Sequence, residues 1–90
     1  MITLFILNDG PYGSERTYNA LRLARTVLKS GQSQVRVFLL GDAAIGAQSG
    51  QKVPQGYYNV ADMLAMLTKH GGELAVCGTC MDARGLAETF

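Results

Sequence analysis

Short apolar runs alternate along this chain with amphipathic segments of helical length. The runs at 2–7 (ITLFIL), 34–40 (QVRVFLL) and 73–77 (ELAVC) are rich in apolar and β-branched residues, which predicts three strands. Between them, apolar residues recur at helical spacing in segments 14–30 and 59–70. Because strands joined by helical crossovers lie parallel, this order predicts an α/β fold with a short parallel sheet and helices on its faces.

Capping and turn residues predict where the elements begin and end. Ser14 and Asn59 are expected to cap the first two helices, which end at Ser30-Gly31 and His70-Gly71. A third helix is expected from Met81 to Phe90, interrupted by a glycine. The almost wholly apolar run 2–7 predicts a central strand covered on both faces. The small, polar stretch 41–56 predicts a long connection, functional or mobile.

The length and charge of the chain exclude several classes. Its 90 residues predict one domain, residues 1–90, with a thin core. Eight basic against seven acidic residues give a net charge of +1, so no broad basic surface for nucleic acid is expected. No stretch approaches the roughly 18 apolar residues of a membrane span, and the first apolar run has no basic residues before it, so neither a span nor a secretion signal is expected. A cytoplasmic location is therefore expected.

The third predicted helix has only just begun where the chain stops. A three-stranded parallel sheet leaves unpaired backbone groups at its edges. We therefore expect either a further C-terminal segment, the fold being C-terminally truncated, or cover by other subunits in a homo-oligomer.

Two cysteines enclose the turn after the third strand, in the motif Cys77-Gly78-Thr79-Cys80. Reactive groups gather where parallel strands end, and the amides at a helix N-terminus stabilise a thiolate. A lowered pKa would make Cys77 a nucleophile near neutral pH, and the positive charge of Arg84 would add to this effect.

Four interpretations of this motif stay open on the residues alone. Both thiols are small half-buried hydrophobes, or they form a dithiol of the kind that thioredoxin-like proteins use in disulfide exchange. A zinc site needs about four ligands, and the chain offers one cysteine pair and His70, so metal would have to be shared between subunits. The fourth interpretation is a thiolate that accepts and passes on a sulfur atom as a persulfide. No cofactor is expected.

Three motifs resemble the DsrE/DsrF-like family, which includes YchN-like and TusD-like proteins. They are the run A-V-C-G-T-C-M-D-A-R-G at 75–85, the N-D-G-P-Y-G turn after the first strand and the G-D-A turn after the second. The resemblance covers nearly the whole chain. It implies a three-layer α/β/α fold with flavodoxin-like winding, and assembly as dimers, trimers or hexamers. It also implies a role in sulfur relay between donor and acceptor proteins.

The same resemblance assigns roles to single residues. Relay members carry one active cysteine at the end of the third strand and an Arg-Gly pair beginning seven residues later. Cys77 with Arg84-Gly85 matches that spacing, so the active role is transferred to Cys77. Cys80 has no counterpart in those members and resembles a C-G-T-C subgroup. As an auxiliary or resolving thiol it would convert a Cys77 persulfide into a disulfide and release sulfide.

Further residues complete the candidate site. The first and third strands are neighbours in the usual order of such sheets, and the loop after the first strand would then lie beside Cys77. The candidate ligand-binding residues are then Gly10, Tyr12, Gly13, Ser14, Gly78, Thr79 and Arg84. A simple strand-to-helix turn is the favoured interpretation of the first loop.

Other charged residues have structural interpretations that outweigh functional ones. Arg22, Arg25 and Lys29 line one side of the first helix; a solvated face is favoured over docking of an acidic partner. His70 is expected to cap a helix. Asp9, Asp42 and Asp82 follow strand ends, where turn capping is favoured over metal binding.

The expected function is therefore that of a small sulfur-relay protein, with a persulfide carried on Cys77. The alternatives are a non-catalytic oligomeric binding protein and a dithiol oxidoreductase that uses the Cys-x-x-Cys pair.

Overall fold

The computed structural model describes residues 1–90 and contains one parallel sheet. Its strands are β1 (Ile2–Leu7), β2 (Gln34–Leu39) and β3 (Glu73–Val76), arranged in the order β1-β2-β3. The helix α1 (Arg16–Ser30) joins β1 to β2. A short 3₁₀ helix, η1 (Gly41–Ala47), and α2 (Val60–Lys69) join β2 to β3, and α3 (Gly78–Ala83) follows β3. The predicted α/β class with a short parallel sheet is confirmed.

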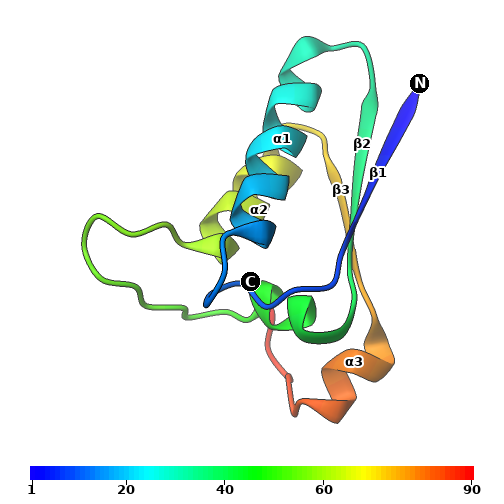
Figure 1. Cartoon of the computed structure of the whole chain (residues 1–90). Helices are drawn as coiled ribbons and strands as arrows, with labels where there is room; N and C mark the ends of the chain where they lie inside the picture. Colours follow the sequence, from blue (N-terminus) through cyan, green and yellow to red (C-terminus); the bar gives the residue numbers. More distant parts are fainter.

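The strand order differs from the expected arrangement in which β1 and β3 are neighbours, because β2 lies between them. Both crossovers therefore step in the same direction across the sheet. Since crossovers between parallel strands are right-handed in nearly all proteins, two steps in one direction put both helices on the same face. Figure 1 shows α1 and α2 together on one side of the three strands. The helical layer expected on the opposite face is not present in residues 1–90.

The hydrophobic core lies between the sheet and this pair of helices. The largest fully buried side chains come from β2 and α2: Leu39, Leu64, Val35, Val37 and Val60. Alternate residues of a strand point to opposite faces, so Val35, Val37 and Leu39 share the face that meets the helices. Complete burial of one such side chain contributes about 1.5–3 kcal/mol to stability, and most of this contribution is concentrated on one side of the sheet.

The opposite face of the sheet is open and partly apolar. Ile2, Leu4 and Ile6 of β1 are 54%, 56% and 54% exposed, so the prediction of a central strand covered on both faces is wrong. β1 is an edge strand: the side chains on its helix-facing side are partly to fully buried, and those on its other side are exposed. On the same open face, Arg36 Nε lies 2.7 Å from Glu73 Oε2, in a pair that bridges β2 and β3.

Two of the expected helix starts differ from the structure. Ser14 does not cap α1: the N-cap is Glu15, and no side chain accepts a hydrogen bond there. The helix α3 starts at Gly78 rather than Met81 and ends at Ala83, because the Cys77 sulfur caps it and Gly85, with φ of 63°, turns the chain away. The expected Asn59 cap is confirmed, since its side-chain oxygen accepts the amide of Asp62 at 3.1 Å.

The connection from 41 to 56 forms the 3₁₀ helix η1 in its first half. In η1, small residues pack against α2, and the alanines Ala43, Ala44 and Ala47 are buried. A Cβ on Gly46 would come within 3.2 Å of the Val60 side chain, so the close approach of η1 to α2 favours glycine there. The end of the chain returns to this region, where Gln48 forms an isolated antiparallel bridge with Thr89. None of the helices is both long and apolar enough to span a bilayer.

Candidate functional site

The cysteine motif lies at the carboxyl edge of the sheet, directly after β3. The Cys77 amide donates to the Leu39 carbonyl oxygen at 2.9 Å, which continues the β2–β3 pairing by one residue. Cys77 then becomes the N-cap of α3. Both cysteines are free and half-buried, and the intervening Gly78 and Thr79 are exposed. The sheet thus holds the backbone of Cys77 while the turn leaves its sulfur partly open to solvent.

Hydrogen bonds converge on the two sulfur atoms. The Cys80 amide donates to Cys77 Sγ at 3.4 Å, and the Gly41 amide donates to Cys80 Sγ at 3.2 Å. The pKa of the Cys77 thiol is lowered, first by the hydrogen bond from the Cys80 side chain, then by the amides of Cys80 and Thr79 and by the charge of Arg84; burial acts in the opposite direction. A larger thiolate fraction near neutral pH makes Cys77 the nucleophile of the pair.

Arg84 connects the cysteine turn to the loop after β2. Its Nε and Nη2 donate to one carboxylate oxygen of Asp42 at 3.0 and 2.8 Å, and its Nη1 donates to the Cys80 carbonyl at 3.2 Å. An ion pair with so exposed a carboxylate contributes only about 0–1 kcal/mol to stability. Its main effect is therefore positional, because it holds the guanidinium beside α3.

The loop after β1 is not joined to the cysteines. The expected neighbouring of β1 and β3, on which that placement depended, is wrong because β2 separates them. A Cβ on Gly10 would meet Asp42 at 3.8 Å, and Gly13 has open space around it. Tyr12 donates to Gln51 at 2.6 Å and accepts the Val60 amide at 3.1 Å, so it binds the start of α2. The Ser14 carbonyl accepts from the Tyr58 hydroxyl at 3.5 Å.

Gly41 and Asp42 are the site residues that the sequence prediction missed. They contact the motif from the end of the neighbouring strand, through the Cys80 sulfur and the Arg84 guanidinium respectively. The signal for them is the G-D-A turn after the second strand, which contributes to the family resemblance and in which Asp42 was expected to cap a turn. Parallel strands end at one edge of a sheet, so this turn meets the turn after β3 once the two strands pair.

Acidic and thiol side chains do not gather as a metal ion requires. No group of three or more His, Cys, Asp or Glu side chains is placed to hold one. Asp9 instead pairs with Arg16 at 3.3 Å, and Asp42 with Arg84 at 2.8 Å. The arrangement after β3 is suited to thiol chemistry.

Comparison with known proteins gives consistent matches over nearly the whole chain. The model of the DsrE/DsrF-like family matches residues 1–90. The protein YchN of Escherichia coli is 40% identical over 86 residues, which are 93% of this chain and 72% of YchN. An uncharacterised protein of Methanopyrus kandleri is 39% identical over 83 residues, 92% of this chain and 67% of that protein. The crystal structure of the E. coli YchN protein superposes with a TM-score of 0.87 at 38% identity, covering 96% of this chain and 74% of that one.

Proposed function

The chain belongs to the DsrE/DsrF-like family, and from this premise we propose that it carries sulfur between proteins as a persulfide on Cys77. One observation carries the proposal: the half-buried Cys77 sulfur, at the end of β3, accepts the Cys80 amide at 3.4 Å. Such hydrogen bonding favours the thiolate, which is the form that attacks sulfur. Family membership supports a sulfur-relay role in general, and this geometry supports the choice of residue.

The proposed uptake step is an exchange at sulfur. The Cys77 thiolate attacks the outer sulfur of a donor persulfide, R–S–SH, and the donor leaves as the thiolate R–S⁻. Cys77–S–SH is formed, with no net oxidation or reduction. Delivery is the same exchange in reverse: an acceptor thiolate attacks the outer sulfur and Cys77 leaves as a thiolate. A lowered pKa assists both steps, since Cys77 is nucleophile in one and leaving group in the other.

Cys80 provides a second reaction for the sulfur carried on Cys77, in which it is released as hydrosulfide. Attack of the Cys80 thiolate on the inner sulfur of Cys77–S–SH forms the Cys77–Cys80 disulfide and expels hydrosulfide. The pair of thiols is oxidised by two electrons and the outer sulfur is reduced to sulfide. A small-molecule thiol is then needed to return the disulfide to the dithiol. The hydrogen bond from Gly41 to Cys80 Sγ holds this second sulfur beside the turn.

Intact-mass measurement after incubation with cysteine persulfide tests the proposal. Wild type and Cys80→Ser should each gain the mass of one sulfur atom, and Cys77→Ser should gain none. Cys80→Ser should retain the added sulfur longer, because the hydroxyl cannot displace hydrosulfide. Equal sulfur uptake by Cys77→Ser and wild type would show that Cys77 is not the carrier.

A dithiol oxidoreductase is the second candidate, and the contact between the two cysteines favours it specifically. The Cys80 amide donates to Cys77 Sγ at 3.4 Å, so the two cysteines lie close together across the first turn of α3. This function predicts a reversible Cys77–Cys80 disulfide in a glutathione redox buffer near the cytosolic potential, with no sulfur gained from the persulfide. A Cys77 that neither gains sulfur nor forms this disulfide would instead favour a non-catalytic binding protein.

A further inference from the structure

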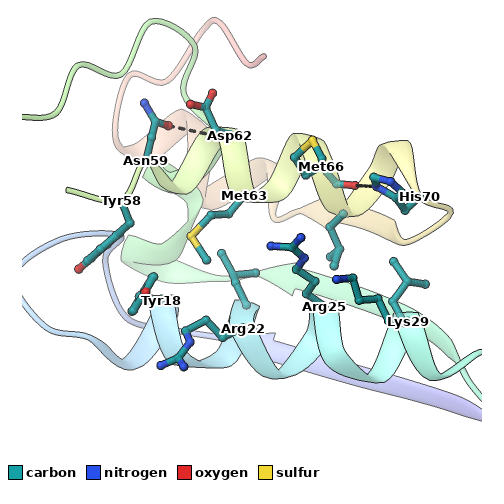
Figure 2. Close-up of a pocket in the computed structure, with 13 residues that line it drawn as sticks. Tyr18, Arg22, Arg25, Lys29, Tyr58, Asn59, Asp62, Met63, Met66 and His70 are labelled. Carbon is teal, nitrogen blue, oxygen red and sulfur yellow. Dashed lines mark hydrogen bonds between the residues drawn. The ribbon is translucent and has the colours of Figure 1, made fainter. Parts of the chain in front are cut away.

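A groove of about 850 Å³ runs between α1 and α2, on the helical side of the molecule (Figure 2). Its lining extends from Tyr18 to Lys29 on α1 and from Asn59 to His70 along α2. At about 1.5 Å per residue, each side is roughly 16 Å long, or about three helical turns. The groove is therefore elongated and runs parallel to both helices.

The floor of the groove is apolar. Leu21 and Leu67, both buried, contribute to it, and Met63 projects from α2 toward α1 in Figure 2. Met66 adds a side chain that is 46% exposed. Methionine adapts its shape to different apolar partners, which makes such a floor suitable for another side-chain surface.

One wall of the groove is cationic. Arg22, Arg25 and Lys29 lie at intervals of three and four residues along α1, and none of them forms an ion pair. Figure 2 shows Arg25 and Lys29 reaching from α1 toward the space between the helices. The ion pairs of the structure use the other three arginines, outside the groove. Asp62 is the one carboxylate in the lining, and His70 at the far end adds no negative charge.

Stacked aromatic rings occupy the remaining end. The ring centroids of Tyr18 and Tyr58 are 4.1 Å apart, and the Arg22 guanidinium lies 5.5 Å from the Tyr18 ring. The Arg22 guanidinium therefore lies beside the Tyr18 ring at this end of the lining. The wall thus presents three positive charges over about 10 Å, at the repeat of a helix.

We propose that this groove binds an acidic amphipathic helix of a partner protein. A helix lying along α1 and α2 places side chains at i, i+3, i+4 and i+7 on one face, the spacing at which the three cations recur. Its apolar residues meet Met63, Met66 and Leu67, and its carboxylates meet the cationic wall. A polyphosphate backbone fits less well, because the positive charge lies on one wall of an apolar channel. The proposal is independent of Cys77 chemistry.

Fluorescence anisotropy with a synthetic helical peptide tests the proposal on the full chain. The labelled peptide has about four turns, with leucine along one stripe and glutamate at flanking positions of i, i+3 and i+7 spacing. The wild-type protein should bind it, and should bind a copy with lysine for every glutamate at least about tenfold more weakly. Amide shifts in NMR spectra should fall on α1 and α2.

Two triple variants distinguish the effect of the charges in the groove from the effect of the protein's net charge. Arg22→Glu with Arg25→Glu and Lys29→Glu should weaken peptide binding at least about tenfold. Arg16→Glu with Lys52→Glu and Lys69→Glu changes the net charge equally outside the groove and should change binding less than about threefold. Circular dichroism checks that each triple variant is folded, and Met66→Gln, which removes an apolar contact without changing the charge, should also weaken binding.

Several results would overturn the proposal. They are equal weakening by the two triple variants, no binding by wild type at millimolar peptide, or peptide shifts outside α1 and α2. Binding of phosphatidylserine vesicles or of a free fatty acid, lost in the groove variant while the peptide does not bind, would assign the groove to a lipid surface or a small amphiphilic anion instead.

Discussion

The Gly41 amide donates to the Cys80 sulfur at 3.2 Å, although 39 residues separate them in the chain. Gly41 begins the connection after the central strand β2, and Cys80 belongs to the first turn of α3 after β3. Cys80 in turn donates its backbone amide to Cys77 Sγ at 3.4 Å, and its side chain lowers the pKa of the Cys77 thiol. The end of one strand therefore orders the thiol that tunes the reactive cysteine at the end of the next.

The first prediction concerns the pKa of Cys77. Replacing Cys80 with alanine removes the thiol donor and should raise the Cys77 pKa toward that of a free cysteine, while Cys80→Ser keeps a donor and should raise it less. The iodoacetamide alkylation rate of Cys77 measured against pH gives the midpoint. In wild type the rate should level off at lower pH than in Cys80→Ala. Identical midpoints in the two proteins would contradict the assigned cause.

A second prediction compares the two residues expected from sequence to cap helices. Asn59→Ala removes the acceptor for the Asp62 amide and should lower the free energy of unfolding by about 1 kcal/mol. Ser14→Ala removes no cap, since the α1 N-cap has no side-chain hydrogen bond, and should change it by less than about 0.5 kcal/mol. Urea denaturation monitored by circular dichroism measures both. A Ser14 effect as large as that of Asn59 would mean that Ser14 caps α1 in solution.

A third prediction concerns the one-sided core. Leu64→Ala opens a cavity where the side chain is fully buried and should destabilise the fold by about 2–5 kcal/mol. Leu4→Ala removes a side chain that is half exposed on the open sheet face and should cost less than about 1 kcal/mol. Chemical denaturation at a low, fixed protein concentration gives both values. Comparable losses would imply that the open face is covered in solution.

A fourth prediction follows from two glycines near β3. A Cβ on Gly72 would lie 2.9 Å from the Leu67 carbonyl oxygen, so Gly72→Ala should shift the backbone and destabilise by about 1–3 kcal/mol. Gly78 has open space around it and lies in the first turn of α3, so Gly78→Ala should be neutral or slightly stabilising. The melting temperatures of the two variants, compared with that of wild type, measure both effects. Equal melting temperatures for both would contradict the close approach at Gly72.

The fifth prediction tests the expected homo-oligomer at the open face of the sheet. The exposed row Ile2, Leu4 and Ile6 is apolar, and such rows favour association. We expect wild type to self-associate and Ile6→Lys to shift the protein toward monomer in sedimentation velocity. Leu23→Lys is the matched control, since Leu23 is similarly exposed but lies on α1. If the wild-type protein were monomeric at high micromolar concentration, the exposed side chains of Ile2, Leu4 and Ile6 would not mediate self-association.

Features that depend on neighbouring residues in the chain could be predicted from the amino-acid sequence. Apolar periodicity located the three strands and the two longer helices, Asn59 marked a helix start, and the spacing of Cys77 and Cys80 placed two thiols at a strand end. These features follow from backbone propensity and local hydrogen bonding, which act over a few residues.

The arrangement of those elements in space depends on packing across the whole chain. The direction in which each crossover steps across the sheet is not encoded in any short pattern, because it depends on which faces bury most apolar surface together. In the observed strand order β2 lies at the centre, and one row of β1 side chains is exposed. Tyr12 binds the start of α2 instead of lying beside the cysteines. This strand order also brings Gly41 to Cys80 and sets α1 beside α2, which creates the cationic groove. Contacts between residues distant in sequence arise only when the whole chain packs, so this level of the structure could not be predicted from local patterns.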